Sequence, residues 1–122
     1  MALVLFIDNH PASCEPLMRM LAGIGHHTQV TPADPSALEI ANKIRPNLII
    51  LGLRLPLANE VQLLEQMRAQ TSLNGQRVAI LSTAIDPAIE SYSRQLGSSA
   101  WLLRGGDLIG MAQQLEQLLT NP

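Results

Sequence analysis

Four short, almost purely apolar runs constrain the fold of this chain more than any other sequence feature. They cover residues 2–7, 47–51, 78–81 and 101–103. Unbroken apolar runs of this length are typical of strands buried on both faces, as in a parallel sheet covered by helices. A weaker run, residues 27–31, has Val30 as its one strongly apolar member and fits an edge strand.

Helical patterns lie between these runs, because apolar residues recur there at spacings of three and four. The predicted apolar faces are Cys14/Leu17/Met18/Leu21, Ala37/Leu38/Ala41/Ile44, Val61/Leu63/Leu64/Met67, Ile89/Tyr92/Leu96 and Leu108/Met111/Ala112/Leu115/Leu119. Asp86 before Pro87 predicts a capped helix start, and Asp107 is predicted to cap the last helix. Pro46 and Gly97 are predicted to follow helix ends.

Five strand-then-helix units in 122 residues predict a single α/β domain over residues 1–122. Five strands with a weak second strand favour the three-layer flavodoxin-like arrangement, a parallel sheet of order 2-1-3-4-5. Functional residues in such sheets lie beyond the carboxyl ends of the strands. We therefore expect Asp8, Asn9, Gly52, Ser82 and Arg104 to meet there.

Composition narrows the classes of function. The formal net charge of −2 argues against a general nucleic-acid-binding surface, which needs a basic excess. A single cysteine rules out an internal disulfide and suits a reducing compartment. No apolar run approaches the roughly 20 residues of a membrane span. We therefore predict a cytoplasmic domain that contacts neither membrane nor nucleic acid directly.

Several segments in order resemble the receiver domain of bacterial response regulators. Residues 4–11, VLFIDNHP, resemble the receiver opening, where an apolar strand runs into an acidic pair. Residues 45–56, RPNLIILGLRLP, resemble the segment that carries the phosphoacceptor aspartate. Residues 81–83, LST, and 97–104, GSSAWLLR, resemble the segments with the conserved hydroxyl, the switch aromatic and the lysine. The resemblance covers essentially the whole chain and implies a role in two-component signal transduction.

The departures from the receiver pattern carry the functional expectation. The phosphoacceptor position falls on Gly52, which has no nucleophile, and the acidic pair is reduced to Asp8 and Asn9. Arg104 replaces the lysine and Gly105 replaces the proline after it. With two of three carboxylates missing, we predict no magnesium binding and no cofactor. A buried Asp8 would then need a partner, and Arg104 is the predicted one.

The resulting hypothesis is a pseudo-receiver that acts through protein contact without aspartyl phosphorylation. The resemblance implies a partner or homodimer surface on the fourth helix, fifth strand and fifth helix, including Tyr92 and Trp101. Trp101 is read equally well as an interface residue or as a partly exposed anchor whose indole N–H reaches solvent. Alternatives are a sensor that holds an anion or small ligand in the vacated crevice, and a phosphorelay receiver with another acceptor. No enzyme activity is expected, since no activated nucleophile is visible.

Other polar residues are given ordinary structural roles. His10, His26 and His27 are expected to be solvent-exposed, because no Cys or His stands at ligand spacing. Cys14 is expected to be a small core residue. Ser82 is expected to be a strand-end hydroxyl. The polar face of the last helix, with Gln113, Gln114, Glu116 and Gln117, is expected to point outward.

Overall fold

A five-stranded parallel sheet forms the centre of the protein, as seen in a computed structural model that describes residues 2–121. The strands are β1 (Leu3–Ile7), β2 (His27–Thr31), β3 (Leu48–Leu53), β4 (Val78–Ser82) and β5 (Ala100–Leu103). They lie in the order β2-β1-β3-β4-β5, and every neighbouring pair is parallel. The predicted flavodoxin-like topology, including the edge position of β2, is therefore confirmed.

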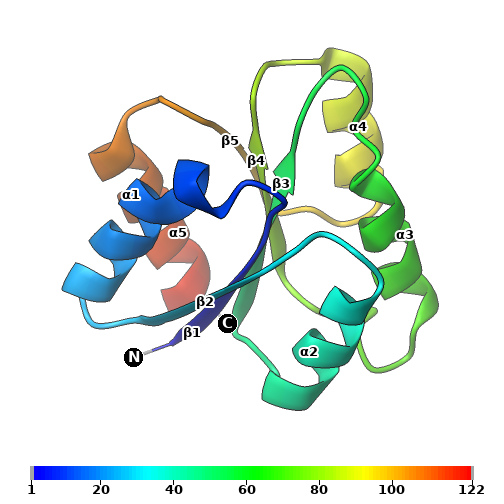
Figure 1. The fold of residues 1–122 in the computed structure, drawn as a ribbon, viewed down its shortest axis with the longest axis horizontal. Coiled ribbons are helices and arrows are strands. Elements are labelled where there is room, and N and C mark those ends of the chain that lie inside the picture. Colours follow the sequence, from blue (N-terminus) through cyan, green and yellow to red (C-terminus); the bar gives the residue numbers. More distant parts are fainter. Residues whose placement is uncertain (1, 122) are drawn as a thin grey trace.

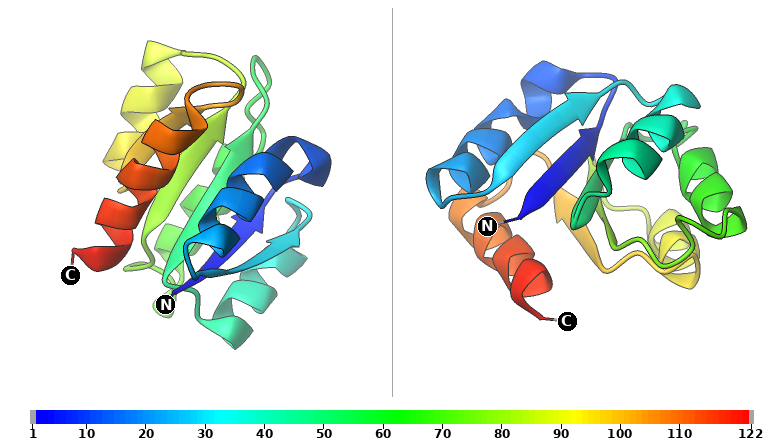
Figure 2. Two further views of the ribbon diagram at one scale, coloured as in Figure 1. Left: turned by 90° about the vertical axis from the view of Figure 1, so that its left-hand side faces the viewer. Right: turned by 90° about the horizontal axis from the view of Figure 1, so that it is seen from below.

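Five helices cover the two faces of this sheet (Figure 1). They are α1 (Pro11–Gly23), α2 (Ser36–Ile44), α3 (Val61–Ala69), α4 (Pro87–Gln95) and α5 (Leu108–Thr120). Helices α1 and α5 pack side by side on one face, and α2, α3 and α4 cover the other (Figure 2). No helix within residues 2–121 has the length and apolar character that crossing a membrane requires.

The strand residues supply both halves of the core because alternate side chains point to opposite faces. Leu5, Ile7, Ile49 and Leu51 belong to the cluster beneath α2 and α3. Val4, Phe6 and Ile50 belong to the cluster beneath α1 and α5. All six residues of β3 are buried, as expected for the central strand. The two-sided burial explains why this segment reads as an unbroken apolar run.

Two of the predicted helix caps had different outcomes. Asp86 accepts hydrogen bonds from the backbone N–H groups of Ala88 and Ile89 at 3.0 and 3.1 Å, so it caps α4 as predicted. Asp107 precedes α5, but its side chain makes no capping hydrogen bond, and that prediction is wrong. Its backbone carbonyl accepts the N–H of Met111 instead. The Asp107 carboxylate lies beside Gly110 in the first turn of α5 but does not cap the helix.

Arg68, on α3, connects the loop between α3 and β4 with the loop between α4 and β5 through hydrogen bonds. Its guanidinium donates to the carbonyl oxygens of Leu96 at 2.6 Å and Gln76 at 2.8 Å. Two further carbonyls, of Leu73 and Asn74, accept from the same side chain at 3.1 Å. One arginine thus satisfies backbone acceptors in two separate loops, and partial burial lowers the pKa of its guanidinium.

Candidate functional site

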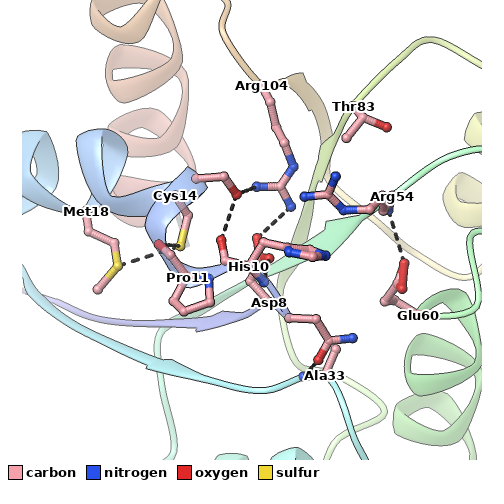
Figure 3. A network of polar contacts seen from close by, with 12 residues as sticks. Asp8, His10, Pro11, Cys14, Met18, Ala33, Arg54, Glu60, Thr83 and Arg104 are labelled. Atoms are coloured by element: carbon pink, nitrogen blue, oxygen red, sulfur yellow. Dashed lines mark hydrogen bonds and ion pairs between the residues drawn. The ribbon is translucent and has the colours of Figure 1, made fainter.

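The carboxyl edge of the sheet holds a buried ion pair between its first and last strands. Asp8 follows β1 and Arg104 follows β5; their Oδ2 and Nη2 atoms lie 2.6 Å apart (Figure 3). The two side chains are 3% and 11% exposed. The second carboxylate oxygen of Asp8 accepts the backbone N–H of His10 at 2.7 Å. Arg104 also donates from Nη1 to the Ser13 hydroxyl at 2.6 Å. The predicted Asp8–Arg104 pair is therefore confirmed.

Gly52 lies directly beneath this pair. A Cβ atom built on Gly52 would stand 2.3 Å from Asp8 Oδ2 and 2.4 Å from Arg104 Nη2. Both separations are far shorter than a van der Waals contact. The volume that any side chain at position 52 would fill is therefore occupied by the two charged groups. The ion pair can form in this place only because position 52 carries no side chain.

The structure does not gather all five predicted site residues. Asp8, Gly52 and Arg104 are in contact, but Asn9 is exposed and its Oδ1 accepts the N–H of Ala33 at 2.9 Å. Ser82 is fully buried, and its hydroxyl donates to the carbonyl of Ala84 at 2.8 Å. Asn9 fixes the loop after β2, and Ser82 fixes the turn after β4. Both side chains have structural partners outside the Asp8–Arg104 pair.

Ser13 belongs to the site, although sequence reasoning missed it. Its hydroxyl accepts from Arg104 and donates to the carbonyl of His10 at 2.7 Å. A signal was present, because Ser13 lies in the first turn of the helix that follows β1. In a parallel α/β sheet, the helix that follows a strand begins at the carboxyl edge of the sheet, where the strand ends also lie.

The metal-binding capacity of the site is small. Asp8 supplies the carboxylate that lies next to Gly52 in this site. Both oxygens of the Asp8 carboxylate already accept hydrogen bonds, from His10 and Arg104. Within residues 2–121, no three His, Cys, Asp or Glu side chains gather into a metal-binding group. Magnesium favours several oxygen ligands with carboxylate charge. The absence of magnesium binding stays a prediction, which a titration can test.

The residues predicted for an interaction surface differ in their exposure. Tyr92, on α4, is 41% exposed, and its hydroxyl donates to the carboxylate of Glu65 on α3. That hydrogen bond raises the pKa of Tyr92 because it stabilises the neutral phenol. Trp101, on β5, is half-buried, and its buried indole Nε1 has no hydrogen-bond partner among residues 2–121. The expectation that this N–H reaches solvent is wrong, because the ring packs against the α2–α4 core cluster.

One of the three histidines is buried, contrary to the prediction. His26 lies between the N-terminus of β1 and α5, where its Nδ1 accepts the N–H of Ala2 at 3.1 Å. Its Nε2 lies 2.7 Å from Glu116 Oε2. Glu116, predicted to point outward, is therefore turned towards His26. His10 and His27 are exposed, as expected.

Cys14 lies in the core on α1, as expected. The side chain is fully buried. Burial, followed by the negative charge of Asp8, raises the pKa of the thiol to about 11. The thiol therefore stays protonated at neutral pH and packs as a small apolar group.

Comparison with known proteins identifies the fold. The structure of a putative response regulator from Chloroflexus aurantiacus superposes with a TM-score of 0.86, over 98% of each chain at 18% identity. Chemotaxis protein CheY4 of Vibrio cholerae gives a TM-score of 0.83 at 20% identity, covering 97% of this chain and 98% of CheY4. The N-terminal receiver domain of Klebsiella pneumoniae RstA gives 0.83 at 18% identity, covering 98% and 99%.

Sequence comparison is consistent with this fold. The DNA-binding response regulator MtrA of Mycolicibacterium smegmatis is 26% identical over 101 residues, which are 83% of this chain. The aligned chain spans 43% of the length of that relative. No family model matches the sequence. The protein is a three-layer α/β domain of the flavodoxin-like class. More particularly, it has the CheY-like fold of response regulator receiver domains.

Proposed function

We propose that this chain is a receiver domain of the two-component type that works by protein contact, without aspartyl phosphorylation. The single observation that carries the proposal is the occupation of the space above Gly52 by the Asp8–Arg104 pair. An acyl phosphate needs a carboxylate at that position and room for a phosphoryl group beside it. Here the nucleophile is absent and the room is filled.

The ion pair also argues for a single conformation of the crevice. Asp8 and Arg104 follow β1 and β5, which are separated in the sheet by β3 and β4, so their contact joins both sides of the carboxyl edge. Breaking a buried pair of this kind costs about 3–5 kcal/mol, because one charge is left without a partner. A domain held by such a contact fits a constant docking module better than a switch between two states.

A shallow hollow on α4 and β5 supports contact with another protein chain. It has a volume of about 160 Å³ and is lined by Glu90, Arg94, Ser98, Ser99, Ala100 and Trp101. The neighbouring α5 presents exposed glutamines with few charges, which would oppose a second copy only weakly. A homodimer through α4, β5 and α5 fits these features.

Labelling with radioactive acetyl phosphate in the presence of magnesium tests the absence of phosphorylation. We expect no hydroxylamine-labile label on the wild-type chain, because no carboxylate stands at position 52. Any label found would be mapped with the Asp8→Asn variant, which removes the remaining carboxylate of the site. A stoichiometric acyl phosphate on the wild type would refute the proposal.

Analytical ultracentrifugation tests the contact surface. We expect a reversible dimer in the micromolar range that is weakened at least tenfold by Ser99→Arg, which places a bulky cation at the hollow. The matched control is Gln66→Arg on α3, an equally exposed residue outside the hollow. A wild-type chain that remains monomeric at millimolar concentration would refute self-association, as would equal effects of the two arginines.

The alternative of a ligand sensor in the vacated crevice has weaker support. The space that the missing carboxylate leaves is taken by Arg104 and Asp8, whose charges compensate each other. An anion there would have to displace Asp8 from the guanidinium. Thermal-shift screening with phosphate and sulfate distinguishes this function from a contact domain.

A further inference from the structure

The loop between α3 and β4 carries the dipeptide Asn74-Gly75 in an exposed turn. This loop covers residues 70–77 and lies at the amino edge of the sheet, away from the Asp8–Arg104 pair (Figure 1). Exposed loop tips are the places where a chain is most open to chemical attack. The side-chain amide of Asn74 and the backbone N–H of Gly75 are both accessible to water there.

Both of these groups are free of competing contacts. Within residues 2–121, no hydrogen bond involves the Asn74 side chain or the Gly75 backbone N–H. A Cβ atom built on Gly75 would have no heavy atom within 4 Å, so the space around this residue is open. Because glycine has no side chain, its nitrogen is also unshielded. The Gly75 nitrogen can therefore approach Cγ of the preceding asparagine.

We propose that Asn74 is a site of spontaneous deamidation in this protein. The Gly75 nitrogen gives its proton to solvent base and attacks Cγ of Asn74. The new N–Cγ bond closes a succinimide ring, and the bond from Cγ to Nδ2 breaks, so that ammonia leaves with a proton from water. Water then opens the ring at either carbonyl and gives aspartate or isoaspartate. This modification is independent of the function proposed above.

The other asparagines are less suited to the reaction. Three of them have side chains held by hydrogen bonds, namely Asn9, Asn42 and Asn47. Asn121 is followed by a proline, which has no N–H. Asn59 is exposed like Asn74, but the residue after it is Glu60, whose side chain shields the attacking nitrogen. Asn59 therefore serves as a matched control within the same chain.

Isoaspartate at position 74 would disturb the loop that Arg68 holds. The carbonyl oxygens of Leu73, Asn74 and Gln76 accept from Arg68 Nη1 at 3.1, 3.1 and 2.8 Å. Isoaspartate carries the main chain through its side chain, which adds a methylene group to the backbone between the first and last of these carbonyls. The three acceptors then no longer converge on the same nitrogen. Aspartate keeps the normal backbone and leaves the loop intact.

Incubation of the pure chain in H₂¹⁸O at neutral pH, followed by tryptic digestion and mass spectrometry, tests the proposal. The peptides 55–68 and 69–77 separate Asn59 from Asn74. We expect ¹⁸O to enter Asn74 at least about tenfold faster than Asn59. Gly75→Ala, whose Cβ meets no neighbour, should slow the reaction at Asn74 by about tenfold. Equal rates at the two asparagines, or an unchanged rate in Gly75→Ala, would overturn the proposal.

Hydrogen exchange tests the consequence for the loop. The isoaspartate form, separated by ion exchange and identified by isoaspartyl methylation, is compared with the unmodified chain. The Gln76 amide donates to Leu73 at 3.1 Å and should exchange roughly tenfold faster in the isoaspartate form. Asn74→Asp represents the other product and should exchange like the unmodified chain. Equal exchange in the isoaspartate and unmodified forms would refute the effect on the loop that Arg68 holds.

Discussion

Replacing Arg104 with methionine removes the charge from the buried pair while keeping an apolar side chain in its place. Two unit charges 2.6 Å apart attract each other by about 6 kcal/mol at an effective dielectric of 20. The cost of desolvating both groups reduces this net value. The variant, however, leaves Asp8 buried without its cation, for which the observed cost is about 3–5 kcal/mol. We expect a loss of that size in the free energy of unfolding.

The matched control is Arg94→Met on α4. Arg94 pairs with Glu90 at the same distance, 2.6 Å, but its side chain is 68% exposed, against 11% for Arg104. An exposed pair one helical turn apart contributes about 0.3–0.5 kcal/mol. Urea unfolding measures the free energy of unfolding of both variants. In thermal unfolding of a domain of this size, a loss of 3 kcal/mol corresponds to a decrease in Tm of about 10–15 °C. Equal losses for the two variants would show that burial of the Asp8 pair has no energetic consequence.

A double-mutant cycle isolates the pair itself. Asp8→Asn alone leaves the guanidinium without its carboxylate, and the double variant with Arg104→Met removes both charges. We expect the double variant to be more stable than the sum of single losses predicts, by about 2 kcal/mol or more. Additivity to within about 0.5 kcal/mol would refute the direct coupling.

Three further changes have defined outcomes in the same unfolding assay. Gly52→Ala should lower the free energy of unfolding by about 2–3 kcal/mol, because the new Cβ collides with the Asp8–Arg104 pair. In the control Gly75→Ala, no heavy atom lies within 4 Å of the new Cβ, and the loss should be under about 0.5 kcal/mol. Similar losses for the two variants would contradict the crowding at Gly52. Arg68→Met should lower the free energy of unfolding by about 2–3 kcal/mol, because the backbone carbonyls that accept from Arg68 lose their donor. An unchanged stability would show that water replaces the guanidinium as the donor. Unfolded Cys14 ionises near pH 9.0 but the folded thiol near 11, so stability should fall between these values in the wild type. The fall should be smaller in Cys14→Ala, in which the raised pKa of Tyr92 still contributes, and an identical pH profile would disprove the shifted pKa of Cys14.

Much of the fold could be predicted because burial leaves a direct trace in the sequence. The apolar run at residues 48–51 is unbroken because β3 is covered on both faces, and Val30 stands almost alone because β2 is an edge. The ion pair could be predicted for a related reason. Asp8 and Arg104 each follow a buried strand, and the topology brings both strand ends to one edge.

The remaining site features depend on three-dimensional neighbours that a local pattern does not encode. His26 is buried because Glu116, 90 positions later, lies within hydrogen-bonding distance. The Asn9 side chain reaches Ala33 in a loop instead of turning towards the crevice. The indole of Trp101 faces the core because the α2–α4 layer covers that end of β5. In each case the position of the side chain depends on a contact with a residue far away in the sequence. A local sequence pattern does not show which distant residues come into contact.

The contact from Asp8 to Arg104 spans the ends of two intervening strands. It therefore acts as a cross-brace that links the motions of β1 and β5, which share no backbone hydrogen bonds. Amide protons at the ends of these two strands should exchange with solvent through one shared opening event, even though the strands lie at different positions in the sheet. The absence of a side chain at Gly52 leaves room for this contact, and the carboxyl edge of the sheet thus becomes one cooperative unit.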